Sequence, residues 1–404
     1  MNPVLHSHEH IHSRFRALDS FLFAYQGLWR PRPFTHLQLP WERQYPELAQ
    51  WLRQRSLSEA EAAHNHPEHL AAPFPFSALA AEAMALSQIP ALPVVPLEPV
   101  APRMSVDVPG RKWQQIEAFA SHLNFQRTPT HWLDWCAGKG HLGRRLTHGG
   151  QGLTCLEYDP ALVEAGRQLS ARLHIEAEHI CQDVMADDTW RRLSNQDTAV
   201  ALHACGDLHV RLMRLASQVG CRQLAIAPCC YNRISGSSYQ ALSNEGQASA
   251  LHLSVDDLGL PLSETVTAGA RVRRQRDLSM ARRLGFDLLQ RQINGVDQYL
   301  STPSLPTSWL DKPFADYCRA LAELKGMPDL GTPDWAALEA AGRERLAQVR
   351  NLELLRNLFR RPLELWLVLD RALFLQEQGY QVQVGTFCDS RLTPRNLLLL
   401  AERV

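Results

Sequence analysis

This sequence lacks several features that would assign a protein to a cellular setting. Its formal net charge is +0, because 42 acidic residues balance 42 basic ones, so no overall field attracts nucleic acid or anionic lipid. No secretory signal is recognisable, and no apolar run approaches the roughly 18 residues of a membrane span. We therefore expect a soluble, cytoplasmic protein that does not associate with membranes.

Cysteine is sparse, and lysine is sparser still. Nine cysteines, an odd number, are spread thinly along the 404 residues, which argues against a disulfide-stapled fold and favours reduced thiols. Nearly all of the positive charge is carried by arginine. Arginine suits bidentate phosphate binding, but a GC-rich genome produces the same bias.

The residues that are present divide the chain into three parts. Residues 1–89 show helical periodicity and are predicted to form a helical N-terminal domain. Residues 90–110 are a proline-rich linker, in which a proline at every third position favours an extended connector lying over the next domain. A partner-binding proline ligand is the alternative. Residues 111–404 form the third part, interrupted at about 240–360 by a helical, arginine-rich insertion.

Short apolar runs alternate with helical stretches from residue 111 onward. This alternation predicts an α/β fold with a parallel, doubly wound, Rossmann-like sheet. A long helix follows the insertion, and two last strands are joined by a turn too short for a parallel crossover, so they form an antiparallel hairpin. The predicted strands are HWLDW (131–135), GLTCLE (152–157), EHICQD (178–183), TAVALHA (198–204), RQLAIAP (222–228), YQVQVGTFC (380–388) and NLLLLAER (396–403), and the helix is LELWLVLDRALFLQEQG (363–379).

The turn after the first predicted strand carries a G-x-G-x-x-G motif, GKGHLG, which begins at Gly138. Its glycines let the backbone turn tightly and approach a ligand, and the next helix offers unpaired N–H groups. The motif by itself fits a nicotinamide dinucleotide as well as S-adenosylmethionine (SAM). Glu157, at the end of the second strand, would bind ribose hydroxyls in either case. Three features favour SAM, as in SAM methyltransferases: Asp134 near the methionine ammonium, Asp183 near the adenine amine, and the antiparallel closing hairpin. The predicted cofactor-binding residues are Asp134, Ala137, Gly138, Lys139, Gly140, Glu157, Asp183 and His203.

Four motifs together resemble those of one family. They are GKGHLG at residue 138, HACGDL at residue 203, PCCYN at residue 228 and TPRNLLLLA at residue 393. Over about 111–235 and 362–404 the sequence resembles the methyltransferase-like-twenty-five group of class I SAM-dependent methyltransferases. The second and third motifs are also similar to the eukaryotic tRNA 2′-O-methyltransferase that modifies the acceptor stem. The resemblance implies a class I fold and SAM use, and it supports an RNA acceptor by analogy.

The HACGDL and PCCYN turns are predicted to form the acceptor side of the site. Methyl transfer needs a group that removes a proton from the acceptor, and His203 is the natural general base. Asp207 would orient His203 or replace it, while Tyr231 and Asn232 would stack on and hydrogen-bond a flat substrate. Alternatively, His203 and Cys205 only pack at the strand end and Asp207 caps the next helix. The predicted catalytic residues are His203, Cys205, Asp207, Cys229, Tyr231 and Asn232.

The cysteines of these turns have two further interpretations. The first interpretation is covalent catalysis, because Cys229 follows Pro228, as the nucleophile of cytosine-C5 methyltransferases often follows a proline. The alternative to covalent catalysis is that Cys229 merely fills a tight strand end. The second interpretation is a tetrahedral N/S metal site formed by His203, Cys205, Cys229 and Cys230. The spacing lacks a Cys-x-x-Cys pair, and adjacent cysteines rarely both ligate one zinc, so no metal is predicted.

The insertion contains the arginine run ARVRRQRDLSMARR, which would bind a phosphate backbone if one helix face gathers its charges. We therefore predict methyl transfer to RNA, with tRNA or rRNA as the acceptor. The alternatives are a protein or small-molecule acceptor, a SAM-binding regulatory protein without catalysis, and a solvated helix face paired with acids. The arginines of the run are Arg271, Arg273, Arg274, Arg276, Arg282 and Arg283.

Overall fold

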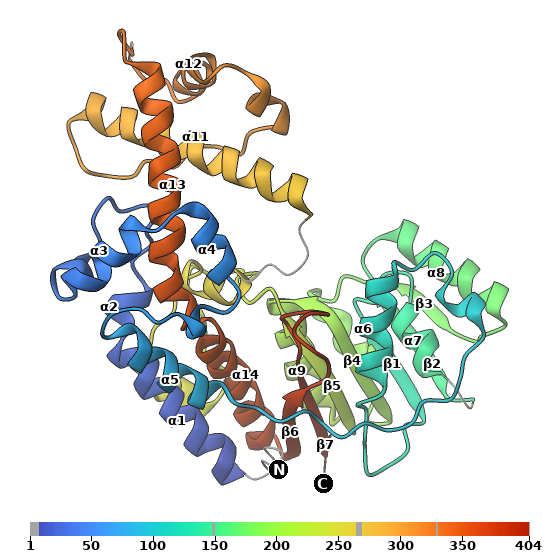
Figure 1. Cartoon of the computed structure of the whole chain (residues 1–404). Coiled ribbons are helices and arrows are strands. Elements are labelled where there is room, and N and C mark those ends of the chain that lie inside the picture. Colours follow the sequence, from blue (N-terminus) through green and yellow to red (C-terminus); the bar gives the residue numbers. More distant parts are fainter. Residues whose placement is uncertain (1–7, 148–149, 264–268, 329, 404) are drawn as a thin grey trace. The chain divides into compact units, whose positions relative to one another are not determined.

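A computed structural model describes residues 8–147, 150–263, 269–328 and 330–403 (Figure 1). The chain forms two compact units. The sheet unit comprises Met1–Phe23, Leu86–Leu262 and Arg361–Val404, and the helical unit comprises Ala24–Ala85 and Ser263–Arg360. Each unit is therefore assembled from segments that lie far apart in the sequence.

The sheet unit is built on a seven-stranded sheet with the order β3-β2-β1-β4-β5-β7-β6. The first five strands of the chain pair in parallel, whereas β7 pairs antiparallel with both β5 and β6. This confirms the predicted α/β, Rossmann-like sheet with an antiparallel C-terminal hairpin. The strands are β1 (His131–Trp135), β2 (Gly152–Glu157), β3 (Glu178–Cys181), β4 (Asp197–Cys205), β5 (Gln223–Cys229), β6 (Tyr380–Thr386) and β7 (Leu397–Arg403).

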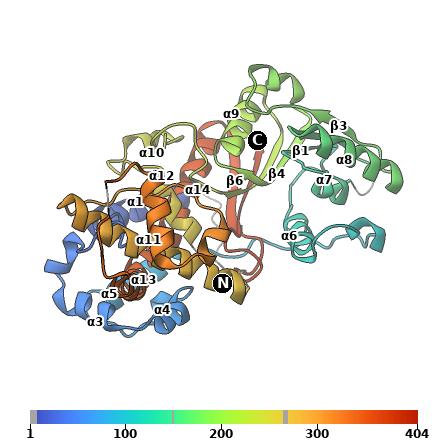
Figure 2. The same cartoon turned by 90° about the horizontal axis from the view of Figure 1, so that it is seen from above.

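Helices cover both faces of this sheet, with α6 and α7 on one side and α9 on the other (Figure 2). Trp132 of β1 packs in one core with Ile116 and Phe119 of α6. Trp135 points to the opposite face, where its indole N–H donates to the carbonyl of Leu208 in α9 at 2.9 Å. Every residue of β5 is buried, as expected for a strand covered on both sides. The helices of this unit are α1 (His8–Ala24), α6 (Gly110–Ala120), α7 (His141–Leu146), α8 (Pro160–Leu173), α9 (Asp207–Val219), α10 (Asn244–Ala248) and α14 (Arg360–Glu377).

The proline-rich segment follows the outer edge of the sheet at β6, where Ala91 and Thr386 form a parallel bridge. The N–H of Leu92 donates to the carbonyl of Thr386 at 2.9 Å, and the N–H of Thr386 donates to the carbonyl of Pro90 at 3.0 Å. Leu92 itself is buried in the core of the sheet unit. The segment is therefore extended at this point, where it pairs with the backbone of Thr386, the last residue of the edge strand β6.

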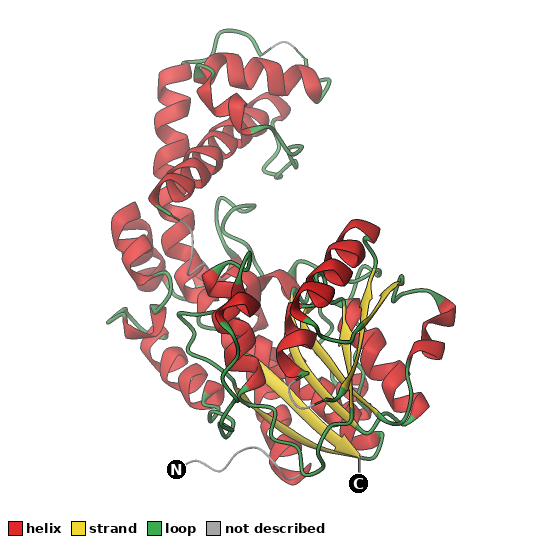
Figure 3. Cartoon of the chain, turned by 90° about the vertical axis from the view of Figure 1, so that its right-hand side faces the viewer, coloured by secondary structure: helices red, strands yellow, loops and turns green. Residues whose placement is uncertain are grey.

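The described part of the helical unit contains helices and loops but no strand (Figure 3). α13 packs along α11 and also against α3 and α4. Asn351 of α13 donates to the carbonyls of Arg55 and Ser56 at 2.9 and 3.0 Å. Among the described residues, no helix of either unit is both long and apolar enough to cross a bilayer. The helices of this unit are α2 (Gln26–Trp29), α3 (Pro46–Gln54), α4 (Leu57–Ala63), α5 (Phe76–Ser87), α11 (Ala270–Asn294), α12 (Phe314–Leu324) and α13 (Trp335–Asn357).

The predicted boundaries at residues 89 and 240 do not coincide with those of the two units. Most of α1 belongs to the sheet unit, where the ring of Phe15 lies 5.1 Å from that of Trp366 and Asp19 accepts the indole N–H of Trp366 at 2.8 Å. Residues 24–85 instead share a unit with residues 263–360. The complementary faces of helices distant in sequence decide this partition, and local periodicity does not contain that information.

Candidate active site

The loop between β1 and α7 contains two glycines in the left-handed region, and each is needed for a different reason. Gly140 has φ +73, and a Cβ there would lie 2.8 Å from Cε1 of His179 and 3.1 Å from Sγ of Cys155. Packing therefore requires glycine at this position. Gly138 has φ +58, and a Cβ there would meet nothing within 4 Å. The backbone at Gly138 consequently borders open space at the carboxyl end of β1, where open α/β sheets bind their ligands.

Glu157, at the end of β2, holds this loop in place. Its Oε2 accepts the N–H of Gly138 at 2.8 Å, and its Oε1 accepts the N–H of Asp159 at 3.0 Å. The side chain is only half-buried. Each carboxylate oxygen retains a further lone pair, which can accept a hydrogen bond from a ligand hydroxyl.

Asp134, in β1, is buried beneath α7, with 2% of its surface exposed. Its Oδ2 accepts the N–H of Gly143 at 2.9 Å. That N–H lies in the first turn of α7, where backbone donors have no partner within the helix. Burial raises the pKa of Asp134 to about 7, against the opposing effect of the Gly143 hydrogen bond. Asp134 therefore anchors the helix that follows the glycine loop, and its contact with a ligand ammonium stays a prediction.

We expect the stability of the protein to depend on pH through Asp134. The unfolded carboxyl has a pKa of about 3.9, so stability is fully present below that value and is lost as pH rises through the folded pKa of about 7. The Asp134→Asn variant does not titrate but still accepts from Gly143. Its advantage over the wild type in unfolding free energy should grow by about 2 kcal/mol between pH 5 and pH 8. Urea unfolding at both pH values measures this, and an unchanged difference would contradict it.

The predicted acids converge around Cys136, which follows β1. Burial raises the pKa of Cys136 to about 12, and nearby negative groups add to the shift. Asp183 is exposed after β3, and its Oδ1 accepts the N–H of Met185 at 2.9 Å. Four groups at this edge of the sheet raise the pKa of Cys136 through their charge. In decreasing order of their contribution they are Glu157, Asp134, Cys205 and Asp183.

Two of the chain's four lysines act at this edge. Lys139 is exposed within the glycine loop. Lys112, near the start of α6, contributes to the pKa shifts of both Asp134 and His203, and so stands close to both. Lys112 was not predicted from the sequence, because α6 has an ordinary amphipathic pattern. The scarcity of lysine in the chain is the one sequence feature from which it could have been singled out.

His203 has a strained backbone, with φ +71, at a register shift between Leu202 and Cys205 in β4. Its Nε2 lies 2.7 Å from Oε1 of Gln115, whose own amide nitrogen donates to the carbonyl of Leu392 at 3.3 Å. That second bond orients the amide, so Nε2 of His203 carries the proton and Nδ1 keeps its lone pair. The residue is exposed, and partial desolvation of the imidazole, followed by the charge of Lys112, lowers the pKa of His203.

The three cysteines at the ends of β4 and β5 form a thiol cluster, defined here as Cys205, Cys229 and Cys230. Their sulfur atoms all lie within 4.8 Å of one another, with 3.5 Å between Cys205 and Cys229. Hydrogen bonds from Cys229 and then Cys205 lower the pKa of Cys230, while those same contacts and burial raise the pKa of Cys229. Cys229 is buried, whereas Cys205 and Cys230 are half-buried, and covalent catalysis by Cys229 stays a prediction.

Two other predicted catalytic residues, Tyr231 and Asp207, have contacts that differ from those expected, whereas the role of Asn232 stays a prediction. Tyr231 is completely buried, with its hydroxyl donating to Glu364 at 3.2 Å, so its ring cannot stack on a substrate. Asp207 accepts the N–H of Ser235 at 2.7 Å and, among the described residues, makes no hydrogen bond to His203. It joins the start of α9 to the turn after β5. Asn232 is half-buried in that turn.

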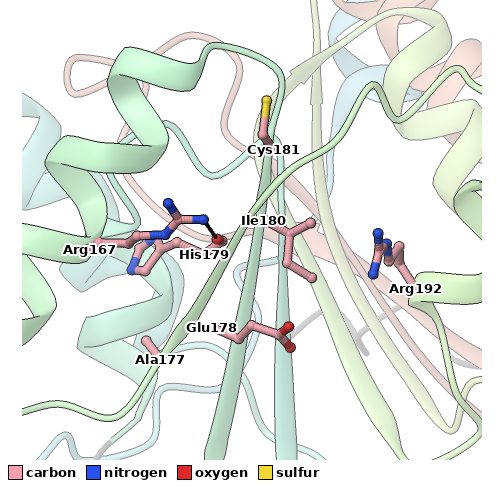
Figure 4. Close-up of a pocket in the computed structure, with 7 residues that line it drawn as sticks. All are labelled: Arg167, Ala177, Glu178, His179, Ile180, Cys181 and Arg192. Carbon is pink, nitrogen blue, oxygen red and sulfur yellow. Dashed lines mark hydrogen bonds between the residues drawn. The ribbon is translucent and has the colours of Figure 1, made fainter.

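A cavity of about 420 Å³ lies at the outer edge of β3. Arg167 of α8 and Arg192 flank the strand on either side, and Arg167 donates to the carbonyl of His179 at 2.8 Å (Figure 4). None of the predicted cofactor-binding residues lines this cavity. It is therefore distinct from the candidate site.

The arginine run of the insertion lies on α11 in the helical unit, and it separates into two groups. Arg282 is buried, donates to the carbonyl of Trp309 at 3.2 Å and lies 5.5 Å from the ring of Tyr317. Arg283 donates to Thr302 at 2.6 Å. Both side chains make contacts within the helical unit, and partner binding by them stays a prediction. The exposed members are Arg271, Arg273, Arg274 and Arg276.

Comparison with known proteins agrees with this geometry. Residues 111–237, which run from α6 through β5, match a family model described as a methyltransferase domain. No curated protein matches the chain. The chain therefore contains a methyltransferase domain, and it is an enzyme of the SAM-dependent methyltransferase class.

Proposed function

We propose that the glycine-loop edge of the sheet binds SAM and that His203 removes a proton from the acceptor. The observation that carries the proposal is the placement of Asp134, Glu157 and Asp183 at or just after the ends of the neighbouring strands β1, β2 and β3, with Glu157 bonded to Gly138 in the loop of a methyltransferase domain. SAM supplies an electrophilic methyl group on a sulfonium. Glu157 accepts from the ribose hydroxyls, Asp183 accepts from the adenine amine, and Asp134 offers negative charge to the methionine ammonium.

The rest of the cofactor site follows from the same loop. Gly138 and Ala137 let the backbone pass beneath the ligand, because no side chain fills the space in front of Gly138. Gly140 supports them by packing against His179. Lys139, together with Lys112, provides the positive charge that a methionine carboxylate requires.

His203 is placed to act as the general base. A lone pair of the acceptor atom forms the bond to the methyl carbon. The carbon–sulfur bond of SAM breaks at the same time, and its electron pair stays on sulfur. The acceptor proton moves to Nδ1 of His203, which Gln115 leaves unprotonated by binding the Nε2–H. A lowered pKa keeps this imidazole neutral at pH 7.

We expect His203→Ala to lower kcat by about 100-fold or more while leaving the affinity for S-adenosylhomocysteine unchanged. In the wild type the rate should rise with pH as the imidazole loses its proton and should level off below the ordinary histidine pKa of about 6.5. Gln115→Leu removes only the positioning contact, so it should shift this pH profile with a smaller loss of kcat. A normal kcat in His203→Ala would contradict the role.

RNA is the acceptor that we propose, within the methyltransferase-like-twenty-five group that the four motifs resemble. The exposed arginines at the start of α11 support this acceptor, because clustered guanidinium groups bind phosphates. Arg282, which is buried, and Arg283, which is half-buried, do not contribute to that support. The similarity of the HACGDL and PCCYN turns to a tRNA methyltransferase makes tRNA the first RNA to test.

Incubation of the protein with methyl-tritiated SAM and separate pools of tRNA, total RNA and protein tests this acceptor. We expect nuclease-sensitive label in the tRNA pool. Replacing Arg271, Arg274 and Arg276 by alanine should raise KM for RNA at least about tenfold and reduce the salt dependence of binding, while Arg343→Ala serves as a matched surface control. Protease-sensitive label would contradict RNA as the acceptor. Binding of S-adenosylhomocysteine without label in any pool would favour a regulatory protein.

A further inference from the structure

We propose that the thiol cluster of Cys205, Cys229 and Cys230 binds one divalent metal ion of thiolate preference, Zn²⁺ in the first place, beside the proposed acceptor site. The residues come from β4 and β5, which are neighbours in the sheet. Their three sulfur atoms lie within 4.8 Å of one another, and 3.5 Å separates those of Cys205 and Cys229. Nothing in this inference depends on the identity of the methyl acceptor.

The spacing of the sulfur atoms fits a tetrahedral ion. Two thiolates bound to zinc at about 2.3 Å and a tetrahedral angle are about 3.8 Å apart. The 3.5 Å between Cys205 and Cys229 is close to that value, and no other sulfur separation in the cluster exceeds 4.8 Å. The same separation is much longer than a disulfide bond of about 2.05 Å, so these are free thiols. Small rotations about the cysteine side chains are enough to close the set.

The backbone explains how two adjacent cysteines reach one point. Successive side chains of a strand normally point to opposite faces, which would separate Cys229 from Cys230. Cys230 instead has φ +39, a left-handed conformation that is unfavourable for any residue except glycine. This turn directs both sulfur atoms towards Cys205, so the objection that neighbouring cysteines rarely share one ion does not apply here. Strain held at such a position is typical of a functional site.

The surroundings suit a bound ion with an open position. Among the described residues, no histidine or carboxylate belongs to the group, so the fourth position is left for water or a substrate atom, as in catalytic zinc sites. Three thiolates and one Zn²⁺ carry a net charge of −1, which Arg233 and Arg395 are near enough to offset. Binding releases the three thiol protons to the solvent. Cys205 and Cys230 are only half-buried, so an ion can enter.

Titration of the untagged, reduced, full-length protein with Co²⁺ tests the site. A thiolate-to-cobalt charge-transfer band should saturate at one ion per chain, and Zn²⁺ should displace it. Cys230→Ser should weaken binding by at least about 100-fold, more than the loss of an outer-shell partner causes. Cys205→Ser provides a second variant in case the first does not fold. Cys181→Ser, an exposed thiol at the end of β3, should bind like the wild type.

The outcomes separate this site from other metal-binding groups and from the proposed function. His66, Glu68 and His69 also lie close together, but an ion held by imidazoles and a carboxylate gives no thiolate band. A missing band, or a band that Cys230→Ser leaves unchanged, would overturn the metal site. S-adenosylhomocysteine binding is measured on the same samples. A cobalt band without S-adenosylhomocysteine binding would support the metal site and contradict the proposed function. S-adenosylhomocysteine binding without a cobalt band would support the proposed function and contradict the metal site.

Discussion

Glu157→Ala is expected to lose at least about 100-fold in affinity for S-adenosylhomocysteine. The carboxylate has two tasks in the proposed complex: it holds the N–H of Gly138, and it accepts from the ribose hydroxyls. Each hydrogen bond to a charged group is worth about 1.5–3 kcal/mol, so two of them account for a loss of this size. Asp183→Ala removes one proposed contact from an exposed position and should lose roughly tenfold.

Isothermal titration of each variant with S-adenosylhomocysteine measures these losses. Glu176→Ala is a matched control, because it removes an exposed carboxylate from the loop before β3, at the opposite end of that strand. NAD serves as the ligand control and should not bind. Wild-type affinity in Glu157→Ala would show that the glycine-loop edge is not where the cofactor binds, and NAD binding would require a nicotinamide interpretation of the loop.

Gly206→Ala is expected to lower the free energy of unfolding by at least about 3 kcal/mol, the upper range for single substitutions. Gly206 joins β4 to α9 and has φ +54. A Cβ at this position would lie 1.9 Å from the carbonyl oxygen of Arg233, which is backbone and cannot rotate away. The substitution must therefore displace the turn after β5, and with it both Cys230 and the Asp207–Ser235 contact.

Gly138→Ala is the matched control for this prediction. Gly138 has φ +58, but a Cβ there would meet no atom within 4 Å, so only backbone strain of about 1–2 kcal/mol is expected. Urea unfolding followed by tryptophan fluorescence compares both variants with the wild type. Equal losses in the two variants would show that the contact with Arg233 yields easily and that strain alone determines the cost.

Much of the fold could be predicted because its elements are locally encoded. The runs HWLDW and GLTCLE coincide with β1 and β2 residue for residue, since both are short, buried stretches bounded by turn residues. The antiparallel hairpin followed from the short connection between β6 and β7. The division into units could not be predicted in this way, because it depends on how α13 packs against α3, α4 and α11.

The types of residue that make up the candidate site could be predicted from the sequence more readily than the role of each residue. Glycines and acids at strand ends predicted that these residues share one edge of the sheet, where the structure places them, because parallel strands bring their carboxyl ends together. The direction of each side chain was not encoded in that pattern. Tyr231 is turned into the core towards Glu364, and Gln115 reaches His203 from a helix 88 residues earlier in the chain.

The sequence by itself therefore predicted the mostly parallel sheet with its antiparallel hairpin, the glycine loop and the edge at which the candidate site lies, because periodicity, turn residues and connection lengths are local properties. Only the tertiary structure decided that Asp134 anchors α7, that His203 is held by Gln115, and that three cysteines from two strands converge. These results depend on the left-handed turns at His203 and Cys230 and on contacts between residues distant in sequence. Such contacts form only once the chain has packed.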